Sequence, residues 1–179
     1  MATYLFLDTE WADLVGDELV SLALISEDGR RRFYAERNPL PPDPTPFVKE
    51  FVYPLLDGGA AALSDQVFTD ALREFVDSVP NPLVLFDYAH DGAMFDKALR
   101  GLGKSPRQDG NDSQVPKELL RNDLISMILE DWFIAHPQEA ARRHHAMVDA
   151  NALRIAWLAS NGLVDAEWSP SWRQARHAQ

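Results

Sequence analysis

The order of short apolar runs along the chain is the feature that most limits its fold. Three runs lie in the first third, at residues 4–7, 19–25 and 32–35, and the turn Glu27-Asp28-Gly29 separates the last two. An Asp-Gly turn between two such runs is typical of a β-hairpin. A fourth run, at residues 83–86, lies among segments with helical spacing. Strands that come first and then alternate with helices predict an α/β domain, with a mixed sheet flanked by helices.

The remaining segments read as helices and connectors. Helices are expected over residues 47–56, 64–79, 93–102, 117–134 and 146–161. Five prolines within residues 38–46 mark an irregular connector, residues 103–116 are expected to form a polar loop, and the tail after residue 168 is expected to be loosely held. With 179 residues and no second-domain boundary, residues 1–179 are predicted to be one domain, with its core at about residues 4–160.

The composition excludes several classes of protein. The chain has no cysteine, which rules out disulfides, Cys-ligated zinc and thiol chemistry. Its first residues reach Asp8 after a few apolar positions, unlike a signal peptide, and no apolar run approaches the ~20 residues that cross a bilayer. A cytoplasmic protein without membrane contact is therefore expected. The net charge of −11 argues against a tight grip on long nucleic acid, unless bound cations and local basic residues supply positive charge.

Two carboxylates, Asp8 and Glu10, end the first apolar run. Residues two apart on a strand point to the same side, so these side chains converge. They would repel each other unless a proton or a cation lies between them, and oxygen ligands suit Mg²⁺ or Mn²⁺. A solvated strand end is an equally good interpretation of the pair alone. A phosphatase with an aspartyl nucleophile is a related alternative, although it would need a second Asp at position 10.

A second candidate group, His144 and Asp149, lies near the start of the last long helix. Val148, Ala152 and Ile155 follow helical spacing, which places Asp149 at the edge of an apolar face. A carboxylate that holds an ion beside an imidazole that takes a proton from water is suited to metal-assisted hydrolysis. A capping Asp with two surface histidines explains the segment equally well. His145 has no role in either interpretation.

Three acids follow the run at residues 83–86 and compete for a place in the same site: Asp87, Asp91 and Asp96. A ligand that meets Asp8 and Glu10 should lie near the carboxyl end of the strand, where sites in open sheets collect. Asp91 is therefore favoured, Asp96 is the next choice although it should be solvated, and Asp87 is a supporting group.

Three segments in order, FLDTEW, DYAHDGAMF and HHAMVDANAL, resemble the exonuclease motifs of the DEDDh superfamily, which includes RNase T, oligoribonuclease and polymerase proofreading subunits. The resemblance runs from about residue 4 to about residue 158 and is strongest to compact bacterial and phage 3′→5′ exoribonucleases. It implies an RNase H-like fold. It also implies phosphodiester hydrolysis from the 3′ end of single-stranded RNA or DNA, or of a short overhang, with release of nucleoside 5′-monophosphates.

The resemblance further implies a role for each matching residue, with two divalent cations, Mg²⁺ or Mn²⁺, as cofactors. Asp8, Glu10 and Asp149 would hold the first cation, Asp8 and Asp91 the second, and His144 would be the general base. Most of the superfamily has an Asn and an aromatic residue before the second-motif Asp, whereas this chain has Ala89-His90. Asp96, which follows Phe95, is the alternative at that position.

The residues beside the acidic pair are candidates for contact with the terminal nucleotide. By the same resemblance, Thr9 would approach the ribose through its backbone and Trp11 would contact the base, where stacking is worth ~1–3 kcal/mol. Packing of Trp11 into the core is equally plausible. Arg142 and Arg143 could contact phosphates or form a solvated helix end. Related enzymes are often homodimers, although the chain has no interface pattern.

Two other functions remain open. One is a nuclease-like module that binds nucleic acid or a protein without cleaving it, and the other is a metal-dependent phosphatase that acts on small nucleotides. Pseudo-enzymes usually lose a ligand, and this chain has a candidate for every acidic position. The complete set therefore favours the exonuclease.

Overall fold

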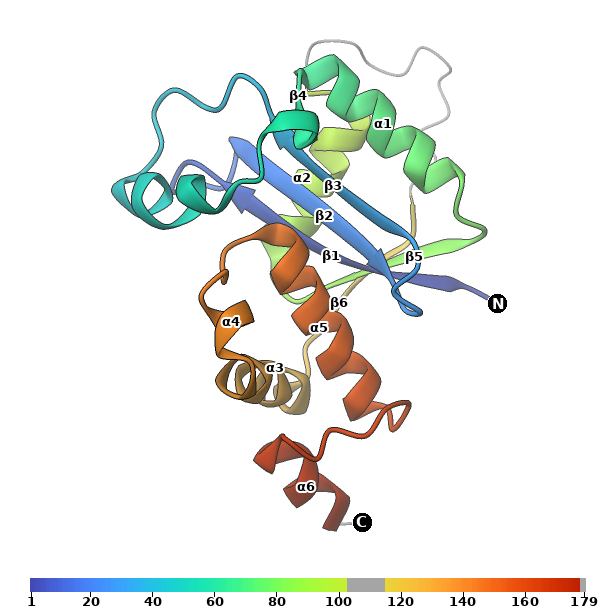
Figure 1. The fold of residues 1–179 in the computed structure, drawn as a ribbon. Helices are drawn as coiled ribbons and strands as arrows, with labels where there is room; N and C mark the ends of the chain where they lie inside the picture. Colours follow the sequence, from blue (N-terminus) through green and yellow to red (C-terminus); the bar gives the residue numbers. More distant parts are fainter. Residues whose placement is uncertain (103–114, 178–179) are drawn as a thin grey trace.

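Six strands form one mixed sheet in the order β4-β3-β2-β1-β5-β6, in a computed structural model that describes residues 1–102 and 115–177 (Figure 1). β1 pairs antiparallel with β2 and parallel with β5, and β2 pairs antiparallel with β3. The short outer strands β4 and β6 are parallel to their neighbours. The strands are β1 (Thr3–Trp11), β2 (Leu19–Ser26), β3 (Arg32–Arg37), β4 (Ala62–Leu63), β5 (Pro82–Phe86) and β6 (Lys117–Leu119). The predicted α/β class with a mixed sheet is confirmed.

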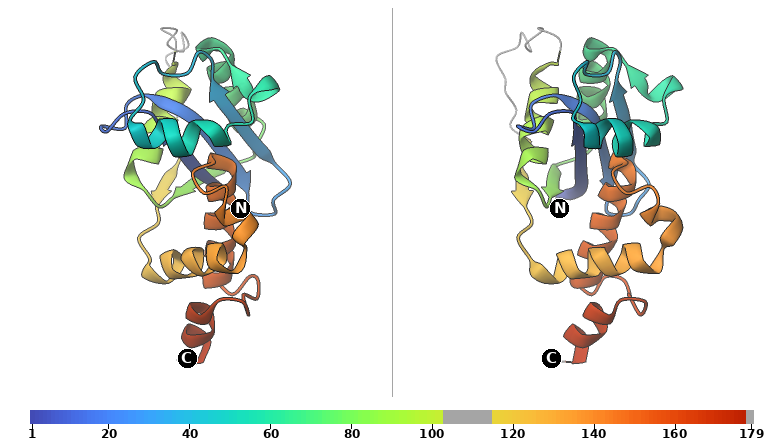
Figure 2. Two further views of the ribbon diagram at one scale, coloured as in Figure 1. Left: turned by 60° about the vertical axis from the view of Figure 1, so that its left-hand side comes forward. Right: turned by 90° about the vertical axis from the view of Figure 1, so that its left-hand side faces the viewer.

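Helices cover both faces of this sheet because the central strand is apolar on both sides. Leu5 and Leu7 of β1 point into the core beneath α1 (Asp65–Asp77) and α2 (Ala89–Arg100). Phe6 points into the opposite core, which α5 (Ala146–Ser160) and α3 (Asp123–Ala135) close. Figure 2 shows the two helical layers on either side of the strands. The central strand is therefore held rigidly, and with it the acidic pair near its end.

The connector between β3 and α1 lies over one end of the sheet. Its helical part is a π-helical turn, η1 (Val48–Val52), followed by the 3₁₀ turns η2 (Tyr53–Leu55) and η3 (Gly59–Ala61). The sequence predicted a helix over residues 47–56. The segment is helical as predicted, but Pro54 lies inside the expected range and interrupts a regular α-helix there.

Two expected boundaries are wrong, and one short helix was not expected. Residues 117–119 form strand β6 instead of the start of a helix, because their backbone pairs with the free edge of β5. Helix α3 then begins at Asp123, where the side chain of Asn122 accepts a hydrogen bond from the backbone N–H of Leu124 at 2.9 Å. Helix α2 begins at Ala89, one turn before the expected residue 93. The short helix α4 (Pro137–Ala140) was not expected.

The tail was expected to be loosely held, and this expectation is wrong. Residues Pro170–His177 form α6, and the Trp172 side chain is 5% exposed. Its indole Nε1 donates a hydrogen bond to the carbonyl oxygen of Ala159 at 3.2 Å, at the end of α5. A buried indole with a satisfied donor anchors the segment to the core. The polar segment expected as a loop lies, up to residue 114, outside the described residues.

Replacement of Trp172 by alanine tests this anchor. The change removes a buried aromatic side chain and should destabilise the fold by ~3 kcal/mol, or ~6–12 °C in Tm at ~2–4 °C per kcal/mol for a chain of this size. Thermal unfolding by circular dichroism measures the shift. A Tm within about 2 °C of wild type would show that α6 is not part of the cooperative core.

No helix in residues 1–102 and 115–177 is long and apolar enough to cross a membrane.

Candidate metal centre

The floor of the candidate site is the end of β1. Asp8 and Glu10 lie opposite Ala23 and Ser21 of β2, so both belong to regular strand and point to the face that α5 covers. The ladder becomes irregular between Glu10 and Trp11, where the strand leaves the sheet. The Oδ2 atom of Asp8 is buried and, among the described residues, has no hydrogen-bond partner. A buried carboxylate oxygen in that condition requires a proton or a cation.

The start of α5 supplies the second wall. His144 has a backbone φ of 75°, in the left-handed region, and its N–H donates a hydrogen bond to Asp149 Oδ2 at 2.9 Å. The other oxygen, Asp149 Oδ1, is buried and has no hydrogen-bond partner among the described residues. One ligand atom from each of Glu10, His144 and Asp149 lies within 4.8 Å of the other two. This spacing suits a single metal ion held by two elements that are far apart in sequence.

Asp91 forms the third wall, from the first turn of α2. Its side chain is 2% exposed, and Oδ1 accepts a hydrogen bond from the Thr9 hydroxyl at 2.7 Å. The following residue must be small, because a Cβ on Gly92 would lie 2.6 Å from the ring of Phe86. Gly92 therefore lets the start of α2 approach the end of β5, which carries Asp91 toward β1.

The structure brings Asp91 to the site and leaves Asp96 outside it. Asp96 lies further along α2 and forms an ion pair with Lys117 of β6, with Oδ1 and Nζ 2.7 Å apart. Asp87 is exposed at the rim of the same pocket as Asp8 and Asp91. The expectation that Asp96 is merely solvated is therefore wrong.

Above these walls lies an open pocket of about 460 Å³. Its base is acidic, and its rim is largely apolar and aromatic. Trp11 lies half-buried in the rim and stacks on Tyr88 and His90, with ring centroids 5.7 Å apart in both pairs. The pocket is lined by Asp8, Thr9, Glu10, Trp11, Asp13, Leu14, Thr45, Phe47, Val48, Asp87, Tyr88, Asp91, His144 and Asp149.

The electrostatics of the pocket are those of crowded, enclosed acids. Burial, followed by the neighbouring carboxylates, raises the pKa values of Asp8 and Glu10 well above their ordinary values. Burial is also the main cause that raises the pKa of Asp91 and of Asp149 to about 7. The pKa of His144 is lowered, by burial first and by Arg143 second. The metal-free site thus retains protons that a divalent cation would displace.

Cation binding should therefore stabilise the protein more at high pH than at low pH. The pKa values of Asp91 and Asp149 are raised from 3.8 to about 7, so their stabilising contribution is complete below about pH 4 and is lost as the pH rises through 7. A bound cation would replace the lost protons. We expect Mn²⁺ at about 100 times its Kd to add ~2.7 kcal/mol, or ~5–10 °C in Tm, at about pH 8, and little at about pH 5. Differential scanning fluorimetry at both pH values measures the effect, and an equal shift at both would contradict it.

Arg142 and Arg143, the two arginines that precede His144, form ion pairs with carboxylates of the protein. Arg143 forms two hydrogen bonds with the carboxylate of Glu130, at 2.8 Å and 2.5 Å, and Arg142 Nη2 lies 3.2 Å from Asp57 Oδ1. Neither interpretation made from the sequence, a phosphate contact or a solvated helix end, anticipated these pairs. Positive charge at the pocket is thus largely balanced by protein carboxylates.

One aromatic neighbour of His144 was missed in the sequence. Phe47 lines the pocket, and its ring meets the ring of His144 edge to face, with centroids 5.0 Å apart. His145 is buried on the other side of the turn. The only signal for Phe47 was its place at the end of the proline-rich connector, which does not indicate where the connector folds back.

Comparison of the chain with protein-family models gives no match, and comparison with curated proteins gives no significant match.

Proposed function

We propose that this chain is a divalent-cation-dependent 3′→5′ exonuclease of the DEDDh type, with an RNase H-like fold. The observation that carries the proposal is the convergence of Glu10, His144 and Asp149, with ligand atoms within 4.8 Å, in a pocket that Asp8 and Asp91 share. The six-stranded mixed sheet with helices on both faces is compatible with that fold.

The residues fit a pair of hard divalent cations. Four carboxylates and one imidazole offer mainly oxygen donors, which suit Mg²⁺ and Mn²⁺. Asp8 and Asp149 each have a buried carboxylate oxygen with no hydrogen-bond partner in the described part of the chain, and a cation could coordinate these oxygens. Asp8, Glu10 and Asp149 would hold the first cation, and Asp8 and Asp91 the second. When bound, such cations activate a water molecule and neutralise the charge that develops on the phosphate.

His144 would accept the proton of the attacking water. Its pKa is lowered, so the ring is neutral near pH 7 and can act as a base. The left-handed backbone and the hydrogen bond from its N–H to Asp149 place the imidazole beside the acidic group, and no ring nitrogen is hydrogen-bonded to another residue in 1–102 or 115–177. Thr9, whose hydroxyl is bonded to Asp91, would keep that carboxylate oriented.

The rim of the pocket favours a single-stranded 3′ end as substrate. Trp11 presents a ring that is supported by Tyr88 and His90, and stacking on a base is worth ~1–3 kcal/mol without reading sequence. Arg142 and Arg143 are paired with acids, and the chain carries a net charge of −11. Both features disfavour a grip on long duplexes, whose affinity depends on phosphate contacts.

The direct test uses 5′-labelled single-stranded RNA and DNA with Mg²⁺ or Mn²⁺. An exonuclease gives a ladder of products that shorten from the 3′ end, and EDTA abolishes it. Labelled strand that is retained but not cut would indicate a binding module, and release of phosphate from small nucleotides would indicate a phosphatase. Absence of a ladder on both polymers, with cation binding intact, would overturn the proposal.

A further inference from the structure

His145 lies next to the proposed general base but points away from the pocket. Its side chain is 3% exposed, and its ring stacks on Tyr34 of β3 with centroids 4.5 Å apart and planes 23° apart. Its Nε2 atom lies 3.4 Å from Asp57 Oδ1, between η2 and η3 of the connector. No step of the proposed reaction uses this histidine, although it is enclosed as completely as the core.

A buried carboxylate fixes the other side of this contact. Glu36 of β3 is 2% exposed, and its Oε1 atom accepts hydrogen bonds from the Tyr34 hydroxyl at 2.7 Å and from the Asp57 backbone N–H at 2.6 Å. Its Oε2 atom accepts a third, from the Gly58 N–H at 3.0 Å. Glu36 thus binds Asp57 and Gly58 of the connector to the sheet, and it orients the Tyr34 ring on which His145 stacks.

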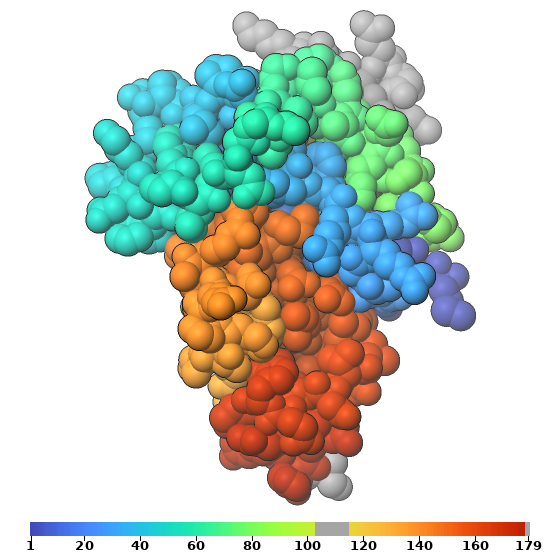
Figure 3. Space-filling model, in the orientation of Figure 1, coloured from blue at the N-terminus to red at the C-terminus, as the bar shows by residue number. Residues whose placement is uncertain are grey.

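The connector therefore contacts the turn that carries His144, here called the catalytic turn, at two points. Asp57 contacts Arg142 and His145 behind the turn, while Phe47 contacts the ring of His144 on the pocket side. Figure 3 shows the connector, in blue-green, packed against the orange segment that contains the turn.

The turn needs such support because His144 has φ 75°, which is unfavourable for a residue with a Cβ atom. The backbone on its C-terminal side is held through His145, whose N–H donates to the Arg142 carbonyl at 3.0 Å and whose carbonyl accepts from the Asp149 N–H at 3.1 Å. If the His145 ring leaves its place on Tyr34, the peptide between the two histidines loses a side-chain anchor and is held by these backbone hydrogen bonds alone. A shift of this peptide would change the direction of the His144 ring.

We propose that His145 is a positioning residue, which holds His144 in its catalytic orientation by stacking on Tyr34 and contacting the connector at Asp57. The inference rests on the proposed function, because it assigns His144 the role of base. Misplacement of a catalytic group by about 1 Å can reduce a rate by about 10²-fold.

The test compares His145→Ala with His145→Phe, which retains a ring that can stack on Tyr34. We expect His145→Ala to lower kcat by about 10- to 100-fold with KM within about threefold of wild type, because bases and cations still bind. His145→Phe should recover most of the loss. Asp57→Ala keeps the backbone bonds to Glu36 and should lower kcat by about threefold to tenfold, so it tests the contact even if His145→Ala does not fold.

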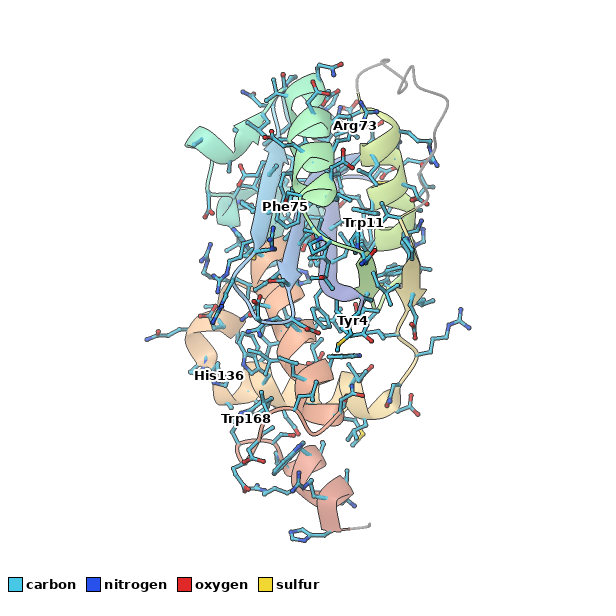
Figure 4. All side chains as sticks on the ribbon, turned by 90° about the vertical axis from the view of Figure 1, so that its right-hand side faces the viewer. Tyr4, Trp11, Arg73, Phe75, His136 and Trp168 are labelled. Atoms are coloured by element: carbon cyan, nitrogen blue, oxygen red, sulfur yellow. The ribbon has the colours of Figure 1, made fainter. Side chains whose placement is uncertain are left out.

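His136→Ala is the matched control. His136 also stacks on an aromatic ring, Trp132, at 5.0 Å, and Figure 4 shows it beside Trp168, toward the end of the molecule that carries α6 and away from Trp11. The His136→Ala substitution should leave kcat unchanged.

A second readout does not depend on activity. The ring ¹⁵N–¹H correlations of His144 should move in His145→Ala and Asp57→Ala but not in His136→Ala. If wild type cuts no nucleic acid, the proposed function fails, and these spectra alone decide whether His145 positions its neighbour. Folded His145→Ala or Asp57→Ala with wild-type kcat and unchanged His144 signals would overturn the inference.

Discussion

Replacement of Asp149 by asparagine is expected to lower the exonuclease rate by at least ~10³-fold, equivalent to ~4 kcal/mol of transition-state stabilisation. Asparagine keeps the size of the side chain and an oxygen that can accept the His144 N–H, so the turn should keep its conformation. It removes the negative charge beside Glu10 and the buried oxygen that has no partner among the residues that the structure describes. Single-turnover cleavage of a 5′-labelled strand measures the loss.

The Asp149→Asn variant should be at least as stable as wild type without metal, and added metal should no longer stabilise it. The pKa of Asp149 is raised to about 7 because burial penalises its charge, so a neutral side chain relieves that cost above pH 7. We expect a metal-free Tm equal to or above wild type and little shift with Mn²⁺. Asp96→Asn is the matched control, since that carboxylate pairs with Lys117 outside the pocket. A cleavage rate of the Asp149→Asn variant within about tenfold of wild type would exclude Asp149 as a cation ligand.

Replacement of His144 by alanine should lower kcat by ~10²–10⁴-fold, the usual contribution of a general base. The expected signature is retention of the Mn²⁺ thermal shift, because the carboxylates remain. His144 also lies close enough to Glu10 and Asp149 to be a ligand itself, and this variant separates the two roles. Loss of the thermal shift together with the rate would identify a ligand, whereas loss of the rate alone identifies a base.

Added imidazole provides a check on the same variant. It should restore part of the activity of His144→Ala, because removal of the side chain leaves space in an open pocket of about 460 Å³. His136→Ala serves as the control for loss of a histidine. Unaltered kcat in His144→Ala would rule out a catalytic role for this residue.

Local patterns in the sequence predicted much of the sheet. Apolar runs predicted the strands β1, β2, β3 and β5, and helical spacing predicted α1 and α5. These patterns are informative because each of these segments buries its own apolar side chains. The convergence of Asp8 and Glu10 follows from strand alternation alone, and the structure shows it. Local periodicity is informative wherever one element lies between two apolar layers.

Segments whose conformation depends on a distant partner were predicted poorly. Residues 117–119 have a composition compatible with helix, and they form a strand only because the edge of β5 is free to pair. The tail becomes helical against α5 because Trp172 finds the Ala159 carbonyl. The connector folds over the site because Glu36, far away in sequence, binds Asp57 and Gly58.

The sequence by itself determined the α/β class, the two acids at the end of β1 and the pairing of a histidine with an acid at the start of α5. Only the tertiary structure decided between Asp91 and Asp96 as the acid that meets Asp8. Asp91 lies in the site because α2 begins one turn earlier than expected, and because Gly92 has no side chain to keep α2 away from β5. The tertiary structure also separated two adjacent histidines into one that faces the pocket and one that faces the sheet. Side-chain direction at a left-handed residue depends on contacts made across the whole domain, and no local pattern encodes it.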